Sequence, residues 1–216
     1  MSANAILSIH TFTPTTETWS SVLDPIRQNP GVKSIYWGKA LEDPEKNVVV
    51  TQWSSREALD AFASSDALAA LAGVAAGGAV TAAHLSLEGT LETALDVPCT
   101  EFVTAYGVEP TFIGRCREFI TKVDASHLEG YHGYAFGEVD QHIAKDAKGQ
   151  KAPAVILIVG WDSKEAHIEA KAKPGPIGEN IHLIRTARED LGVVSIMQNL
   201  LIETVTYLTL SRSMST

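Results

Sequence analysis

Strand-like and helix-like patterns of apolar and polar residues alternate along the first half of the chain. Residues 5–12, 32–41, 47–53 and 79–88 are rich in β-branched and aromatic residues and are bounded by Pro, Gly or acidic turns, which is typical of β-strands. Apolar residues spaced three to four apart after Thr15, up to Pro30, and after Arg56, up to Gly77, predict two helices. The first half therefore has the predicted order strand, helix, strand, strand, helix, strand.

The second half repeats this order with longer connections. The predicted strands are 100–108, 128–139, 153–161 and 193–204, and the predicted helices are 111–124 and 164–190. Pro174 and Pro176 interrupt the second helix, because proline cannot donate to the helical hydrogen-bond ladder. Residues 89–98 are expected to link the halves, 140–151 to form an inserted loop, and 205–216 to form a tail.

A repeated motif supports this division. The pattern Trp-x-Ser-basic-Glu-Ala occurs at residues 53–58 and again at 161–166, each time after an apolar run. Two weaker matches before it and one after it occur in the same order in both halves. A βαββαβ unit is the ferredoxin-like arrangement, whose helices cover one sheet face only. The strands are apolar on both faces, so we expect an α+β protein of two tandem ferredoxin-like units, 1–97 and 98–216. Their antiparallel sheets face each other and form an α/β barrel.

The layout and the Trp-x-Ser-x-Glu-Ala step resemble the dimeric α/β-barrel superfamily, and within it the antibiotic-biosynthesis-monooxygenase-like domains. The resemblance implies that one chain forms the barrel that most members build from two. It also implies a choice of activities: cofactor-independent monooxygenases of aromatic polyketides, polyketide cyclases, lactone isomerases and haem-degrading monooxygenases. The haem-degrading branch carries an Asn on the first strand and a His late in the second helix. Here His182 is the candidate for that histidine, and no inward-facing Asn is predicted.

Charge and composition narrow the partners. The chain has 17 Lys+Arg against 26 Asp+Glu, a formal charge of −9, which argues against nucleic acid and against an anionic membrane surface. We find no apolar run of the ~18 residues that a membrane span needs and no basic signal-peptide region. Cys99 and Cys116 form neither a disulfide framework nor a zinc ligand set. We expect a reduced cytoplasmic protein, either a monomer or a weak homodimer.

Strand alternation suggests candidate site residues inside the barrel. Leu7 and Ile9 are assigned to the helix-covered face, and Ser8 and His10 to the barrel interior. When the two copies are aligned, the prediction matches Tyr106 with His10, Tyr131 with Tyr36, His132 with Trp37 and Asn199 with His84. The predicted catalytic residues are His10, His84, His132 and Tyr36; the predicted substrate-binding residues are Trp53, Trp161, Tyr106, Tyr131 and Asn199. Because His10 and His84 of the first copy are matched by Tyr106 and Asn199 in the second, we expect the dominant site in the first copy.

The function hypotheses follow from these residue types and from missing motifs. We find no glycine-rich nucleotide loop, serine-nucleophile elbow or metal-spaced ligand pair, so no cofactor and no metal are predicted. Histidine and tyrosine can move protons and stabilise enolates. The leading hypothesis is a cofactor-independent enzyme of specialised metabolism that cyclises, isomerises or eliminates a hydrophobic aromatic or polyketide-like molecule. The alternatives are a cofactor-free monooxygenase of a phenolic substrate and a non-catalytic small-molecule-binding or stress-response protein.

Overall fold

The computed structural model describes residues 5–17, 19–78, 80–145 and 149–198. Within them, eight antiparallel strands close into a barrel in the order β1-β3-β2-β8-β5-β7-β6-β4. The strands are β1 (Ala5–Phe12), β2 (Val32–Ala40), β3 (Asn47–Trp53), β4 (Thr81–Gly89), β5 (Cys99–Tyr106), β6 (Tyr131–Glu138), β7 (Ala154–Trp161) and β8 (Asp190–Gln198).

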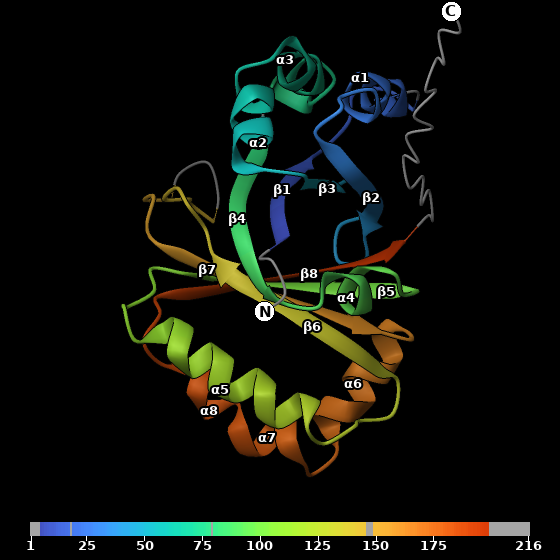
Figure 1. Cartoon of the computed structure of the whole chain (residues 1–216). Coiled ribbons are helices and arrows are strands. Elements are labelled where there is room, and N and C mark those ends of the chain that lie inside the picture. Colours follow the sequence, from blue (N-terminus) through green and yellow to red (C-terminus); the bar gives the residue numbers. More distant parts are fainter. Residues whose placement is uncertain (1–4, 18, 79, 146–148, 199–216) are drawn as a thin grey trace, which may run out of the picture.

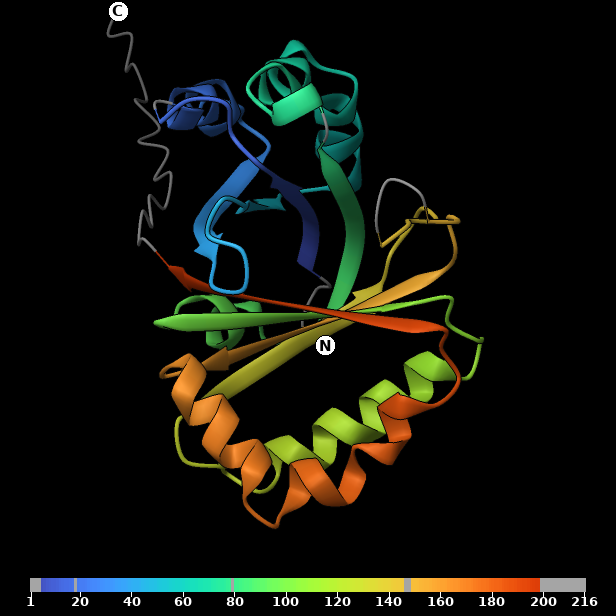
Figure 2. The same cartoon turned by 180° about the vertical axis from the view of Figure 1, so that it is seen from behind.

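Helices lie outside the barrel on two opposite sides (Figures 1 and 2). One side carries η1 (Trp19–Val22), α1 (Leu23–Arg27), α2 (Arg56–Ala63), α3 (Asp66–Gly73) and η2 (Ala76–Gly78). The other carries α5 (Phe112–Asp124), α6 (Lys164–Ala172), α7 (Pro176–Asn180) and α8 (His182–Arg185). A further helix, α4 (Leu91–Leu95), connects β4 to β5. None of the helices in the described part of the chain combines the length and apolar character needed to cross a membrane.

The barrel consists of two sheets with the same strand order. The first sheet is β4-β1-β3-β2 and the second is β8-β5-β7-β6, and they join through β2–β8 and β4–β6 pairing. Each is the sheet of a βαββαβ unit, so the predicted α+β class and the tandem ferredoxin-like architecture are confirmed. We refer to β1–β4 with α1–α3 as the first unit, and to β5–β8 with α5–α8 as the second unit.

The repeated motif is explained by what its residues do. Trp53 and Trp161 each end the third strand of their unit, and both are buried. The serine two positions later is the N-cap of the next helix: the Ser55 hydroxyl accepts from the Ala58 N–H at 3.2 Å, and Ser163 accepts from Ala166 at 3.1 Å. The motif thus ends a strand at its Trp and begins a helix after its Ser, two residues later, in both units.

The strand registers give the true correspondence between the units. Trp53 pairs with Ile6 across β1–β3, and Trp161 pairs with Cys99 across β5–β7. Counting from these pairs shows that Ser8 is equivalent to Glu101 and that His10 is equivalent to Val103. The predicted alignments of Tyr106 with His10 and of Tyr131 with Tyr36 are therefore wrong; Tyr36 corresponds instead to Ala135.

Aliphatic side chains from both sheets fill most of the barrel interior. This core contains Leu7, Ile9, Val50, Leu85, Ile156, Ile158 and Ile196, among others. Leu91, Ala94 and Leu95 of α4 join it at one end of the barrel, so the segment predicted as a linker is a packed helix. Ile143, from the loop between β6 and β7, joins it at the other end. The inserted loop predicted at 140–151 therefore packs on the barrel.

The predicted facing of the first strand is wrong. Leu7 and Ile9 point into the barrel, whereas His10 contacts Phe62 of α2 with ring centroids 5.7 Å apart. The Ser8 hydroxyl accepts a hydrogen bond from the Trp53 indole at 3.0 Å on the same helix-covered side. Both faces of β1 are buried, so burial alone could not separate them.

Helix boundaries differ from the prediction where the chain makes a local turn. The first predicted helix is reduced to η1 and the short α1. The helix after Arg56 is split at Ser64–Ser65, where the Ser65 hydroxyl donates to the Phe62 carbonyl at 2.7 Å. The helix predicted over 164–190 is three helices, and β8 begins at Asp190 rather than at residue 193. The predicted strand beyond residue 198 and the tail lie outside the described residues.

An ion pair links the two units beside the barrel. Arg56 of α2 pairs with Asp140 in the loop after β6 and donates to the Ser86 hydroxyl at 2.9 Å. Both ionic side chains are about one-third to two-fifths exposed, so solvent screens the pair. We expect Arg56→Ala to lower the free energy of unfolding by no more than about 1 kcal/mol, measured by urea denaturation. A loss of several kcal/mol would show that this contact holds the units together.

Candidate active site

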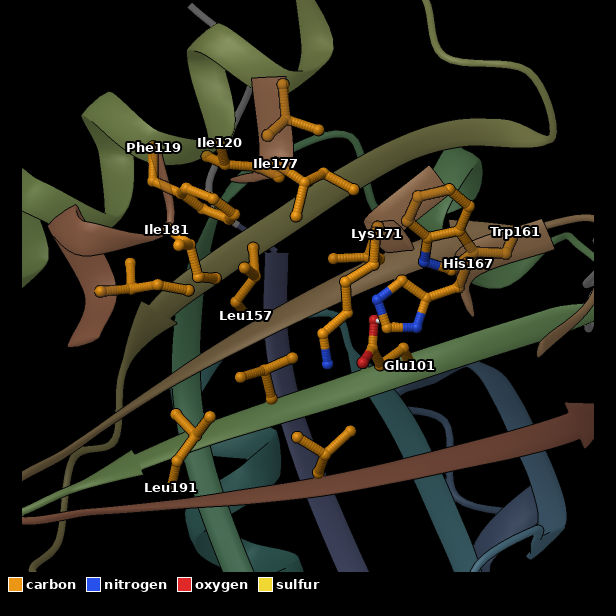
Figure 3. A pocket seen from close by; sticks show the side chains of 15 residues that line it. Glu101, Phe119, Ile120, Leu157, Trp161, His167, Lys171, Ile177, Ile181 and Leu191 are labelled. Carbon is orange, nitrogen blue, oxygen red and sulfur yellow. Dashed lines mark ion pairs between the residues drawn. The ribbon is translucent and has the colours of Figure 1, made fainter. Parts of the chain in front are cut away.

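The second unit contains a largely apolar cavity between its sheet and its helices (Figure 3). Its volume is about 100 Å³. Val193 of β8 lies at its edge and is 40% exposed, so the cavity opens to solvent beside β8. The lining residues are Glu101, Val103, Phe119, Ile120, Val123, Leu157, Val159, Trp161, His167, Lys171, Ile177, Ile181, Ile184, Leu191 and Val193. An apolar cavity of ~150 Å³ holds a benzene ring, so a ring can enter this smaller cavity in part, through its open side.

The polar groups of the cavity gather at one end, around Glu101 (Figure 3). Glu101 lies on β5, points to the helix-covered side and is 5% exposed. Burial raises the pKa of its carboxyl to about 7, although the Lys171 cation and the Trp161 indole act in the opposite direction. A carboxyl group with this pKa is divided between its acid and its carboxylate at neutral pH.

His167 lies directly against that carboxyl group. Its Nδ1 is 3.4 Å from the Glu101 carboxylate oxygen Oε2, and its ring packs on Trp161 with centroids 5.0 Å apart. Burial, together with the smaller effects of the Lys171 and Lys164 charges, lowers the pKa of His167 to about 4. The imidazole is therefore neutral at pH 7 and able to accept a proton or a hydrogen bond.

Helix α6 supplies two polar side chains of this site, His167 and Lys171. His167 and Lys171 are four residues apart, so they lie on one face of the helix. The helix begins at the Ser163 N-cap, two residues after Trp161, which fixes its first turns over the end of β7. The repeated motif is thus also the device that positions His167 over Glu101.

Among the described residues, the first unit has no equivalent group, because a smaller polar side chain and an apolar one occupy the matching positions. Ser8 stands where Glu101 does, and Leu59 stands six residues after Trp53, as His167 does after Trp161. Phe62 packs on Trp53 with centroids 4.8 Å apart and also contacts His10. The expectation that the dominant site belongs to the first copy thus finds no support in the cavity, which lies in the second.

His10 and His84 lie together beneath α2, not inside the barrel as predicted. Their ring centroids are 6.2 Å apart, and His10 is 1% exposed. Burial lowers the pKa of His10 to about 3, with His84 as a smaller cause. Burial also lowers the pKa of His84, and Arg56 contributes to that. Both histidines are neutral at pH 7.

The buried His10 makes the free energy of unfolding depend on pH. Its pKa in the folded chain lies below the ordinary 6.5, so its contribution is complete above about pH 6.5 and is lost as the pH falls towards 3. We expect this group to lower the free energy of unfolding by about 2 kcal/mol between pH 7 and pH 5. The pH slope should be flatter in His10→Leu and unchanged in the control His142→Gln, an exposed histidine, when both are unfolded in urea at each pH.

The remaining predicted residues are dispersed. His132 is exposed, and its Nε2 lies 2.6 Å from the Asp162 carboxylate. The Tyr131 hydroxyl donates to Asp124 at 3.0 Å, and its ring meets Trp161 edge-on, so it supports a wall of the cavity from behind. Among the predicted residues, Trp161 lines the cavity of the second unit.

The other predicted residues lie in the first unit, in the barrel or beyond the described chain. Trp53 is buried beneath α2. Tyr36 is buried in the barrel core, where desolvation raises its pKa to about 12. Tyr106 lies at one end of the barrel. Asn199 lies outside the described residues.

Sequence reasoning missed Glu101, His167 and Lys171. Glu101 is an isolated carboxylate within an apolar strand, on the same side as Cys99 and Val103, and that signal was available in the sequence. His167 is not among the residues that the sequence analysis assigns to the site. Its spacing of four from Lys171 and of six from Trp161 could have placed it over the strand end.

Comparisons with known proteins agree with the fold. Residues 15–73 match the family model described as antibiotic biosynthesis monooxygenase. A comparison with curated proteins finds no significant match. An anthrone oxidase-like protein superposes with a TM-score of 0.66 at 12% identity, over 90% of this chain and 91% of that one. A candidate monooxygenase from Lactobacillus acidophilus gives 0.60 at 14% identity, over 91% and 95%.

The same fold also occurs in a protein of another class. A major regulator of staphylococcal pathogenesis superposes with a TM-score of 0.52 at 8% identity, over 88% of this chain and 98% of that one. At these identities the similarity establishes the fold alone. The family match and the shared architecture confirm the resemblance to antibiotic-biosynthesis-monooxygenase-like domains.

The haem-degrading pattern does not fit the described residues. His182, the histidine that this pattern would require, is exposed on α8, and its Nδ1 lies 3.0 Å from the Glu179 carbonyl. It does not line the cavity. The cavity is also too small for a macrocycle unless α7 and α8 move.

Proposed function

We propose that this protein is a monooxygenase of a small aromatic molecule, and that the cavity of the second unit is its active site. The observation that carries the proposal is the buried Glu101, whose pKa is raised to about 7 beside an apolar cavity. A general base is most effective when its pKa lies near the working pH. The family match over residues 15–73 and the similarity to an anthrone oxidase-like protein favour oxidation over other proton-transfer chemistry.

The residues that line the cavity of the second unit indicate the substrate class. One ring of the substrate enters the space between Phe119, Leu157 and the isoleucines Ile177, Ile181 and Ile184. The rest of a larger molecule extends past Val193 into solvent, because the cavity is open there. The acidic C–H or O–H group of the substrate points to the polar end, where Glu101 lies.

In this mechanism Glu101 removes a proton from an activated CH2 group of the substrate. Lys171 and the Trp161 N–H stabilise the negative charge that develops on the substrate oxygen, as preorganised donors do. Neutral His167 keeps the Glu101 carboxyl in position, and Glu101 gives its proton to the reduced oxygen in the next step, which regenerates the base. The carbanion then adds to dioxygen to form a C–O bond and a peroxide anion, which takes the proton from Glu101. Glu101 next removes the second C–H proton while the O–O bond breaks, so that the carbonyl forms and the departing hydroxide takes that proton as water. The net change converts CH2 and O2 into a carbonyl group and water, without an external reductant.

The proposal is tested by measuring oxygen uptake and product formation with anthrone and with simple naphthols. We expect one dioxygen molecule consumed per carbonyl formed, and kcat/KM that rises with pH around a midpoint of about 7 as Glu101 ionises. Conversion without oxygen uptake would instead support the acid–base cyclase or isomerase hypothesis, which the same Glu101 and His167 could serve. Binding without conversion of any substrate would contradict an enzymatic role and favour a binding protein.

A further inference from the structure

A second cavity lies inside the barrel, at the end opposite α4. Its volume is about 190 Å³. Its floor is apolar and comes from both units: Ile9 and Val48 from the first, Phe102 and Ile156 from the second. Ile143 covers it from the loop after β6. It is separate from the cavity beneath α5–α8, because the second sheet lies between them and no residue lines both.

The polar groups of this cavity are all at its rim. They are the hydroxyls of Thr11, Thr104 and Tyr106 and the ammonium groups of Lys46 and Lys145. No carboxylate is among the described lining residues, although the chain as a whole carries a formal charge of −9. The cavity thus has an apolar interior, with hydroxyl donors and two lysine side chains at its mouth.

The two lysines are available to a ligand. Lys46 pairs with Asp43 at 2.9 Å and Lys145 with Asp190 at 2.8 Å, and all four side chains are between 44% and 52% exposed. Exposed ion pairs of this kind contribute little to stability, so a ligand anion can compete for these cations. Burial raises the pKa of Tyr106, the Thr104 hydroxyl and the Lys145 charge lower it, and the Asp190 charge raises it, so the Tyr106 hydroxyl lies within reach of the Lys145–Asp190 pair.

We propose that this barrel cavity is a second binding site, for a small organic carboxylate with an apolar body. The carboxylate would lie between Lys46 and Lys145 and accept from Tyr106 or Thr104. The apolar body would occupy the space above Phe102 and Ile156. An apolar cavity of ~150 Å³ holds a benzene ring, so about 190 Å³ suits an aliphatic chain of moderate length or a single ring.

Octanoate is the probe, and 1-octanol is the control for the charge. In calorimetric titrations at low salt, we expect octanoate to bind at least tenfold more tightly than 1-octanol. The double variant Lys46→Gln, Lys145→Gln should weaken octanoate binding at least tenfold. The control Lys33→Gln, Lys173→Gln, which removes two exposed lysines outside this cavity, should leave it unchanged. Equal affinity for octanoate and octanol, or equal loss in both double variants, would overturn the proposal.

The position of binding is read from isoleucine methyl signals in NMR spectra. Octanoate should shift the signals of Ile9, Ile143 and Ile156 and leave those of Ile177 and Ile181, which line the other cavity, in place. The reverse pattern would place the carboxylate in the proposed active site and refute a second site. Filling the cavity with Ala83→Leu should abolish binding, and the lysine variants test the proposal even if this variant does not fold. These outcomes do not depend on catalysis.

Discussion

Replacing Glu101 with Gln is expected to lower turnover by about 10²–10⁴-fold, the usual loss when a general base is removed. Gln keeps the shape of the side chain but cannot take a proton, so substrate binding to the apolar walls should change little. The expected signature is therefore a fall in kcat with KM within a few-fold, measured by product formation at pH 7.5. Oxygen uptake should fall in parallel.

A matched control comes from the first unit. Ser8 holds the position equivalent to Glu101 and accepts from Trp53, so Ser8→Ala perturbs the same contact in the other unit. We expect its activity to stay within a few-fold of the parent chain. The hypothesis from sequence predicts the opposite pattern, with large losses in His10→Ala and His84→Ala. If those two variants lose activity and Glu101→Gln keeps it, the site belongs in the first unit.

The fold was predictable because its signals are local. Trp53 and Trp161 each mark a strand end, and Ser55 and Ser163 each mark a helix start two residues later. Such relations depend on backbone geometry and capping within a few residues, and the chain contains them twice. The order βαββαβ then restricts how each sheet can be assembled.

The site was not predictable in the same way, because it depends on which face of a doubly buried strand meets the helices. Leu7 and Ser8 are both 0% exposed, so alternation along β1 gives two equally buried faces. The polar face was assigned to the barrel on the assumption that aliphatic residues pack under helices. In the structure, the aliphatic residues of the two sheets pack against each other. The polar residues of β1 lie on the other face, where they contact Trp53 and an aromatic ring beneath α2.

The difference between the units is also a tertiary effect. A cavity forms in the second unit where His167 and Val103 replace Leu59 and His10, and where no ring comparable to Phe62 packs on Trp161 from the matching helix position. Each substitution is unremarkable in sequence. Only the register, anchored at Trp53–Ile6 and Trp161–Cys99, shows that they face one another.

The Glu101→Gln variant should also be more stable than the parent chain above neutral pH. The pKa of Glu101 in the folded chain is raised from 4.5 to about 7, so folding favours its protonated form. Its contribution is therefore fully present below about pH 4.5 and is lost as the pH rises through 7. From that shift we expect the parent chain to lose up to about 3 kcal/mol of unfolding free energy across this range, a loss that Gln avoids.

The measurement is the difference in unfolding free energy between the two proteins at pH 5, 6, 7 and 8. Taking the difference removes the opposite trend from His10 and His84, whose lowered pKa values make the fold more stable as pH rises. His167, Lys171 and Lys164 also face or influence Glu101, so the experiment is repeated in His167→Leu to separate the histidine. A stability difference that does not grow with pH would mean that Glu101 is ionised without cost, and would remove the physical basis for its role as a base. A difference that grows by a few kcal/mol would show that the chain accepts a less stable fold in order to hold a carboxyl group that is ready to exchange its proton near pH 7.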